Sequence, residues 1–250
     1  MTFILVPAIL KKRLDVIEWE EYKEDCCVVI PVYRKEPVFF EQTSIMQCVR
    51  VLGQRRDICF VAPPDLDLKP YTSLCPGYKF RVKRIAKGFS EGIQGYNQLC
   101  KRWEFYNMFS DYKYILIYQP DCWVFSDMLD YFIGLDYDYI GAPWIAVIDN
   151  QIKPVGCGNG GFSLRKVDKM IEICKNDTRY IENEDIAEDV FFSTKCPGKI
   201  KVCPVEVGQE FSFEVGPTLL YELNNHKLPM GCHKPYLFQF KTFWKDYIKF

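Results

Sequence analysis

The chain has 250 residues, of which 48% are hydrophobic and 26% charged, a composition that excludes a disordered or low-complexity protein. Its 32 Lys and Arg residues against 33 Asp and Glu residues leave a net charge of −1. The absence of a basic excess argues against binding to nucleic-acid backbones. A chain of this length can bury a sizeable core, and it contains neither repeats nor a linker, so we predict one domain.

The N-terminal residues predict a packing arm or short strand. The apolar run at positions 2–10 is about half as long as a membrane span requires. Basic residues at 11–13 follow this run, whereas a signal peptide places its charges before the apolar region. No other run approaches ~20 apolar residues, so we expect no transmembrane helix.

Twelve cysteines are scattered along the chain, and only Cys26 and Cys27 are close neighbours. Scattered cysteines inside apolar runs are typical of small buried hydrophobes in a reducing compartment. We therefore predict a cytoplasmic protein. A disulfide framework is the weaker alternative, and zinc-ribbon spacing is absent.

The next segments predict two buried strands with a helix between them. The apolar run at residues 26–33 suits a buried parallel strand. Residues 39–52 carry helical spacing, with Gly53 as a stop. Residues 58–62 form a second buried strand, which a pair of prolines closes.

The alternation of strands and helices continues toward the middle of the chain. Residues 80–85 alternate apolar and basic side chains, as in a strand near a sheet edge. Residues 90–109 predict one long helix, with Ser90 as its N-cap. Residues 112–118 form the most apolar strand.

A short helix, capped by Ser126 and Asp127, is expected to end at Gly134. Beyond Tyr137, Gly and Pro become frequent and the elements shorten, which is typical of the half that builds a site on a sheet. The order strand, helix, strand, helix predicts an α/β fold with a mainly parallel central sheet and helices on both faces.

A carboxylate follows the most apolar strand. Asp121 is expected at the carboxyl end of the sheet, where ligands of open α/β sheets bind. There it is a ready oxygen ligand for Mg²⁺ or Mn²⁺ held by phosphates. A helix cap or turn former explains an Asp at this position equally well.

Two later segments also allow two interpretations each. Residues 155–165 are dense in Gly without matching a P-loop or a Rossmann fingerprint, so they predict either close backbone approach to a ligand or a tight turn. Acids gather at residues 182–189, where they favour the dipole of the following helix. Alternatively, Glu188 or Asp189 is a general base near the sheet edge.

Basic residues supply further candidates. His233 is one of two histidines and follows a Gly turn, where it is either structural or a metal ligand. The tail at 238–250 mixes aromatic residues with lysines, and it fits either packing on the domain or contact with a membrane surface. A basic strand predicts a solvated face or a contact with donor phosphates or an acidic acceptor; its cations are Arg81, Lys83, Arg84 and Lys87.

Taken together, these segments resemble the GT-A glycosyltransferases. Residues 28–33 resemble the opening strand of that fold, and residues 115–121 resemble the strand that ends in its Asp-x-Asp-type metal motif. Four segments, in their order along the chain, are similar to a bacterial and viral family that is known only as a domain of unknown function and is regarded as glycosyltransferase-like. The set comprises residues 139–144, 158–165, 188–192 and 231–233, and the resemblance covers about residues 26–236.

The resemblance implies a GT-A-like, Rossmann-like domain over residues 1–250 with a smaller mixed-strand half on the acceptor side. It implies a glycosyltransferase that moves a sugar from a nucleotide-sugar donor to a hydroxyl acceptor in polysaccharide or glycoconjugate biosynthesis. Its parts would be an N-terminal arm at 1–25, a nucleotide-binding half at 26–136, an acceptor and catalytic half at 137–236, and an aromatic and basic tail at 237–250. If the tail does not pack on the domain, we expect it to make a peripheral contact with the inner face of the membrane.

The same resemblance implies a divalent cation, Mn²⁺ or Mg²⁺. Asp121 would match the last carboxylate of the metal motif and bind the cation with the donor diphosphate. Gln119 replaces the first Asp, which leaves strict metal dependence open. His233 would match the late His that completes the metal shell in many GT-A enzymes.

Roles for the remaining candidates follow from the resemblance as well. Asp189 would activate the acceptor hydroxyl, as in inverting members, with Glu188 as its neighbour or substitute. Trp144 and Asn159 would contact the acceptor sugar. The donor would be bound by Pro31, Val32, Tyr33, Gln119, Asp121, Gly160 and Gly161.

Two other functional classes remain open on these residues. A nucleotidyltransferase on a similar sheet would accept a nucleoside triphosphate and release pyrophosphate. A carbohydrate-binding protein that has lost turnover would bind sugar regardless of Asp189→Asn, but such a protein has no need of Asp121, Asp189 and His233 together.

Overall fold

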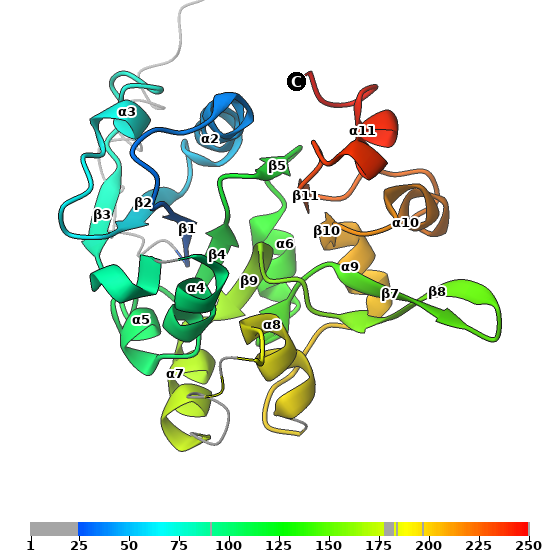
Figure 1. Cartoon of the computed structure of the whole chain (residues 1–250). Coiled ribbons are helices and arrows are strands. Elements are labelled where there is room, and N and C mark those ends of the chain that lie inside the picture. Colours follow the sequence, from blue (N-terminus) through cyan, green and yellow to red (C-terminus); the bar gives the residue numbers. More distant parts are fainter. Residues whose placement is uncertain (1–24, 91, 178–182, 184, 197, 250) are drawn as a thin grey trace, which may run out of the picture.

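A six-stranded sheet in the order β3-β2-β1-β4-β9-β6 lies at the centre of the protein (Figure 1). The structure is a computed structural model that describes residues 25–249 apart from 91, 178–182, 184 and 197. The expected arm at 1–25 lies outside the described residues apart from its last position. The acids Glu182 and Glu184 lie outside the described residues as well.

The sheet is mainly parallel, as predicted. Its parallel strands are β1 (Cys26–Pro31), β2 (Asp57–Ala62), β3 (Arg81–Arg84) and β4 (Tyr114–Tyr118). The strand β9 (Phe162–Lys166) runs antiparallel between β4 and β6 (Tyr139–Ile140). The basic strand β3 lies at the sheet edge, as its alternating pattern indicated.

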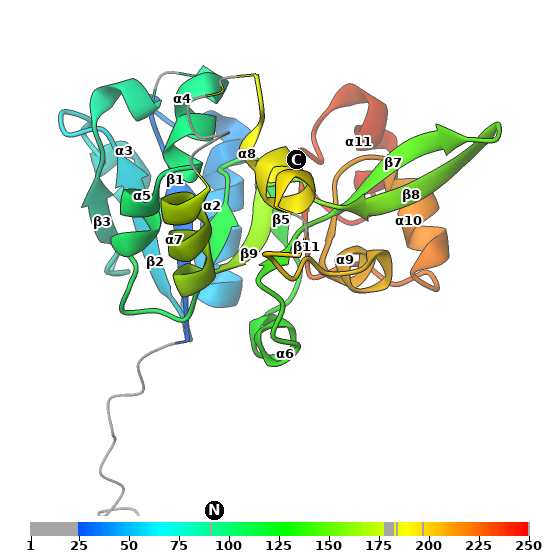
Figure 2. The same ribbon diagram turned by 90° about the horizontal axis from the view of Figure 1, so that it is seen from below.

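Both faces of the sheet are buried. Tyr114, Leu116 and Tyr118 of β4 pack into one core, whereas Ile115 and Ile117 pack into the other, which explains why this strand is apolar throughout. The first core holds residues of α2 (Phe39–Leu52), α3 (Lys69–Thr72) and α6 (Leu129–Gly134). Helices on the opposite face are α4 (Gly92–Cys100), α5 (Trp103–Asn107) and α7 (Val167–Asn176), as Figure 2 shows.

The helix expected at 39–52 is confirmed with the same bounds. Ile45, Cys48 and Leu52 recur at helical spacing and are buried against the sheet. At the N-terminus the Glu41 carboxylate accepts the backbone N–H of Val38 at 2.9 Å, and this satisfies a donor that the helix itself leaves unpaired.

The single helix predicted at 90–109 is wrong. The chain instead forms a short 3₁₀ turn, η1 (Lys87–Ser90), followed by α4 and α5. The side chain of Lys101 is fully buried and donates to the carbonyl oxygens of Asn183 and Ile186 at 2.6 and 3.0 Å. Arg102 is extended (φ −101°, ψ 130°), so the helix ends where this buried ammonium group reaches its carbonyl partners.

A small mixed sheet in the order β10-β11-β5 extends the fold beyond β4. It consists of β5 (Cys122–Val124), β10 (Ser212–Phe213) and β11 (Gly231–His233). The helices α9 (Val205–Phe211), α10 (Pro217–Leu223) and α11 (Phe238–Trp244) surround it (Figure 1). Trp244 and Ile248 of the tail are buried in its core, so this part of the tail packs on the domain.

A two-stranded hairpin projects from the side of the molecule (Figures 1 and 2). It is formed by β7 (Pro143–Ile148) and β8 (Gln151–Cys157).

The segment after α7 holds the short helices α8 (Glu188–Val190) and η3 (Phe191–Lys195). Eleven of the twelve cysteines are buried, as expected. Among the described residues no helix has the length and apolarity to cross a bilayer.

Candidate metal and ligand-binding site

Asp121 lies at the carboxyl end of β4, where the chain turns into β5. The turn is held by backbone hydrogen bonds at 2.9 Å: Gln119 N–H donates to the carbonyl of Gly161, and Cys122 N–H donates to that of Gln119. The Lys234 N–H donates to the Asp121 carbonyl at 2.9 Å. The expected position of Asp121 at the sheet edge is therefore correct.

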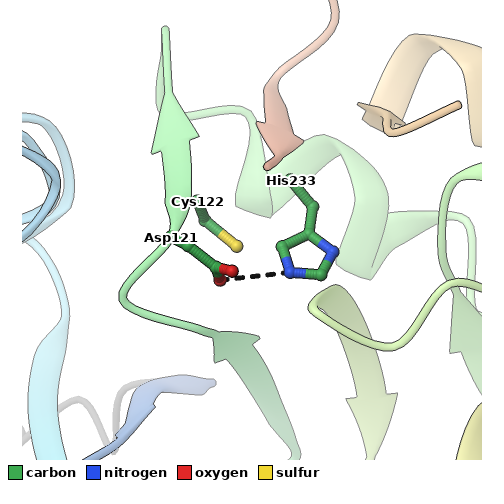
Figure 3. Close-up of side chains that lie close together, drawn as sticks. All are labelled: Asp121, Cys122 and His233. Carbon is green, nitrogen blue, oxygen red and sulfur yellow. Dashed lines mark hydrogen bonds and ion pairs between the residues drawn. The ribbon is translucent and has the colours of Figure 1, made fainter. Parts of the chain in front are cut away.

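His233 lies between two carboxylates. Its Nε2 lies 3.1 Å from Oδ1 of Asp121, as Figure 3 shows, and its Nδ1 lies 3.0 Å from Oε2 of Glu214. The ring is only 4% exposed. The register of the small sheet creates this contact, because β11 pairs antiparallel with β5 and sets His233 opposite Cys122.

The two carboxylates control the charge of His233. Burial of the ring favours its neutral form, but Glu214 and Asp121 outweigh burial and raise the pKa of His233 to about 9. Burial likewise opposes ionisation of Asp121, but the hydrogen bond and charge of His233 hold its pKa below the ordinary value. Asp121 is therefore ionised at neutral pH.

Cys122 is the third potential ligand at this point. Figure 3 shows its sulfur directed toward the same space as the Asp121 carboxylate and the His233 ring. One ligand atom from each of the three residues lies within 4.8 Å of the others. Sequence reasoning missed both Cys122 and Glu214, because a buried Cys and an isolated Glu carry no motif.

The donor set fits a divalent cation. An imidazole nitrogen and a carboxylate oxygen are common ligands of such ions. Metal-ligating histidines also direct their other ring nitrogen to a carboxylate, which is the position of Glu214. Asp121 and His233 would hold the cation.

A pocket of about 230 Å³ opens beside Asp121. It brings together five of the residues proposed from sequence for the donor: Pro31, Val32, Tyr33, Gln119 and Asp121. Other lining residues were missed, among them Arg34, Glu41, Lys234 and Tyr236. Lys234 and Tyr236 follow His233 closely in the chain. Their proximity to a predicted metal ligand could have identified them as candidate site residues.

The pocket joins aromatic walls to charged groups. The rings of Phe40 and Tyr236 stack at 3.8 Å, and the Tyr236 hydroxyl donates to Oδ2 of Asp121 at 3.4 Å. Arg34 Nη1 lies 3.1 Å from Oε1 of Glu41 and remains half exposed. With Lys234, Arg34 gives this pocket two cations beside Asp121.

Gly160 and Gly161 lie in a crowded place. A Cβ on Gly160 would overlap the Glu188 carboxylate, and one on Gly161 would overlap the His233 ring. Glycine is required here because site side chains occupy the space of its missing Cβ. In this structure the side chains of Glu188 and His233, rather than a ligand, fill the space beside Gly160 and Gly161.

Glu188 forms a buried ion pair with Arg165. The Oε2–Nη2 distance is 2.8 Å, and the side chains are 3% and 0% exposed. Burial raises the pKa of Glu188 to about 6 against the opposing effect of Arg165. Burial alone would lower the pKa of Arg165, but Glu188 raises it well above its ordinary value, so Arg165 stays charged.

The remaining predicted residues are not among those that line the pocket. Asp189 is half-buried at the start of α8, and the described residues that line the pocket do not include it. Trp144 is half-buried and its ring covers Gly158. The Asn159 amide donates to the carbonyls of Ala142 and Pro143 at 3.4 and 3.2 Å, so this side chain supports the backbone.

Two cations of the basic strand β3 are paired with other groups of the protein. Arg81 is paired with Asp57, and Arg84 donates to the carbonyls of Pro63 and Leu66 at 2.7 and 3.0 Å. Because the strand is mostly exposed and two of its cations are paired within the protein, the predicted solvated face is favoured over a contact with donor phosphates or an acidic acceptor.

This fold is that of GT-A-like glycosyltransferases. The structure is similar to mouse xyloside xylosyltransferase 1 in its apo form, with TM-score 0.54 and 10% identity over 84% of this chain and 97% of that chain. It is similar to the mannosyltransferase Ktr4p of S. cerevisiae in complex with GDP, with TM-score 0.51 and 10% identity over 74% and 68%. The glycosyltransferase GlyE of Streptococcus pneumoniae TIGR4 gives TM-score 0.51 and 14% identity over 90% of this chain and 60% of that chain.

At these identities the likeness establishes the fold, and the predicted GT-A-like architecture is confirmed. Residues 79–233 match the family described as "Protein of unknown function (DUF5672)", and the chain belongs to this family. No curated protein sequence matches the chain.

Proposed function

We propose that the protein is a glycosyltransferase that moves a sugar from a nucleotide-sugar donor to a hydroxyl of a glycan, polysaccharide or glycoconjugate. One observation carries this proposal: Asp121 lines the pocket at the carboxyl end of β4 and also contacts His233. Ligands of open α/β sheets bind at this edge, and the fold is one that glycosyltransferases share.

The donor occupies the pocket in this proposal. Tyr33, with Pro31 and Val32, contacts the base, and Arg34 and Lys234 neutralise the diphosphate. A divalent cation, when bound by Asp121 and His233, supplies electrostatic stabilisation of the leaving diphosphate. Mn²⁺ and Mg²⁺ are the cations that the sequence suggested.

Asp189 is the proposed general base. It takes the proton of the acceptor hydroxyl as that oxygen bonds to the anomeric carbon and the bond to the diphosphate breaks, with inversion at that carbon. Glu188 is unsuited to this role because it is buried against Arg165. Trp144 is the proposed stacking face for an acceptor sugar, whereas we assign Asn159 to the support of the adjacent backbone.

The C-terminal tail supports a smaller part of the proposal. Phe238 is 93% exposed at the start of α11, and Lys241 is exposed on the same helix. We propose that they give a cytoplasmic enzyme a peripheral contact with an anionic membrane surface. Sedimentation with anionic vesicles tests this contact, and equal binding by Phe238→Ser would contradict it.

Nucleotide binding tests the main proposal. The purified protein is heated with UDP, GDP, CMP or TDP and their common sugars, with and without Mn²⁺. A nucleotide at 100 times its Kd adds about 2.7 kcal/mol of stability. We expect one nucleotide to raise the Tm with Mn²⁺, Asp121→Asn to abolish the effect, and Asp168→Asn, an exposed acid on α7, to retain it.

The outcomes separate the functional classes. Absence of any nucleotide effect would contradict the donor site. Release of pyrophosphate from a nucleoside triphosphate would indicate a nucleotidyltransferase. Turnover of the selected nucleotide-sugar that falls at least about 100-fold in Asp189→Asn, with binding retained, would support the proposed base, whereas sugar binding without turnover in the wild type would indicate a binding protein.

A further inference from the structure

We propose that Cys122 is a third ligand of the metal site, so that the site takes a thiophilic divalent cation such as Zn²⁺. This inference rests on the metal site of the proposed function, but it does not depend on the sugar or on turnover. It changes the expected cation, because carboxylate and water ligands alone suit Mg²⁺ and Mn²⁺, whereas thiolate ligands select zinc-like ions.

The geometry of the three side chains carries the argument. Cys122 follows Asp121 in the chain and is opposite His233 in the register of β5 and β11. Their ligand atoms lie within 4.8 Å of one another and converge on one space (Figure 3). Among the residues that the structure describes, this is the one group of at least three potential ligands at such distances.

Burial gives the site one open side. Cys122 is 1% exposed and His233 4% exposed, whereas the Asp121 side chain is 18% exposed and lines the pocket. Three protein ligands with a fourth position open to substrate are the usual arrangement of a catalytic zinc site. The open position here adjoins the pocket that we assign to the donor diphosphate.

The surrounding contacts are consistent with this ligand set. Glu214 lies 3.0 Å from Nδ1 of His233, which leaves Nε2 directed at Asp121 and the shared space. The Cys122 thiol donates to the carbonyl of Gly161 at 3.1 Å. Metal binding would release two protons to solvent, that of the Cys122 thiol and that of Nε2 of the His233 ring. The Gly161 carbonyl keeps the N–H of Gln119 as a donor.

Cobalt absorption provides the test. The full chain, free of affinity tags and kept reduced by a non-thiol reductant, is titrated with Co²⁺, and thiolate-to-cobalt charge-transfer absorption is recorded in the near ultraviolet. We expect this band in the wild type, its loss in Cys122→Ser, and its retention in Cys232→Ser. Cys232 is the matched control, since it is buried on the paired strand β11.

Metal affinity is measured on the same variants. Most sites bind Zn²⁺ more tightly than Mn²⁺, so preference alone decides nothing. We expect Cys122→Ser to weaken Zn²⁺ binding by more than about 100-fold, since the loss of an outer-shell partner already costs 10–100-fold. Mn²⁺ binding should change far less.

Either of two results would overturn the inference: no charge-transfer band in the wild type, or equal Zn²⁺ affinities in the wild type and Cys122→Ser. Circular dichroism of each variant excludes unfolding as the cause of a lost band. If Mn²⁺-dependent nucleotide binding persists alongside either result, the proposed function survives and only the thiolate ligand is rejected. A cobalt band in the wild type that is lost in Cys122→Ser, without any nucleotide binding, would support the thiolate ligand and reject the proposed function.

Discussion

The Nε2 atom of His233 lies 3.1 Å from Oδ1 of Asp121, although 112 positions separate the two residues in the chain. Asp121 follows the last strand of the parallel run in the central sheet, and His233 ends a strand of the small mixed sheet. The candidate site therefore lies at the junction of the two sheets, and residues from both must keep their register for it to exist.

Glu214 is expected to orient His233 for metal binding. Glu214→Gln preserves the shape of the side chain but removes the charge 3.0 Å from Nδ1. Because outer-shell carboxylates typically contribute 10–100-fold to metal affinity, titration calorimetry with Mn²⁺ should show a loss of about that size. Glu210→Gln, in the nearby helix α9, is the control. Equal affinities of the two variants would contradict the assignment.

Gly161 is expected to tolerate no side chain. In Gly161→Ala the new Cβ would overlap the His233 ring, so the ring must move away from Asp121. We expect a loss of about 1–3 kcal/mol in urea unfolding, the usual cost of overpacking, together with weaker metal binding. At Gly134, at the end of α6, a Cβ meets no atom within 4 Å, and Gly134→Ala should leave both properties intact.

The buried pair of Arg165 and Glu188 should behave as one unit. Removing one partner of such a pair costs about 3–5 kcal/mol, because the other charge is left uncompensated. We expect losses of that size in urea unfolding of Arg165→Met and Glu188→Met, and a double variant that loses clearly less than their sum. Lys166→Met, which removes the partly exposed neighbour on β9, should cost little. Additive losses would show that the ion pair is not coupled.

The raised pKa of Glu188 predicts a pH dependence of stability. This pKa is about 6, against an ordinary value of 4.5, chiefly because of burial. The folded state therefore favours the protonated acid: the resulting stabilisation is complete below pH 4.5 and is lost as the pH rises through 6. The stability of the wild type relative to Glu188→Gln should fall by about 2 kcal/mol across this range.

Urea unfolding of both proteins at a series of pH values measures this difference and cancels the contributions of the other titrating groups. A constant difference across the range would show that Glu188 titrates normally despite its burial.

Local patterns determined much of the fold. The helix of residues 39–52 has the predicted bounds, since its apolar spacing and stop residue lie within the segment itself. The strand ending at Tyr118 was also predicted, because both of its faces are buried and every residue is apolar, although it begins at Tyr114 rather than at residue 112. A carboxylate directly after such a strand must lie at the sheet edge, and Asp121 does.

The tertiary structure decided what lies beside those residues. The helix predicted at 90–109 is broken because the Lys101 ammonium reaches carbonyls more than 80 positions away. Glu188 resembled a possible base, but its partner Arg165 comes from another element of the fold. Glu214 and Cys122 join His233 only through the register of β5 and β11 and the packing around it. Periodicity reports which face of an element is buried, but contacts between distant segments depend on how the sheets assemble, and those contacts form the site.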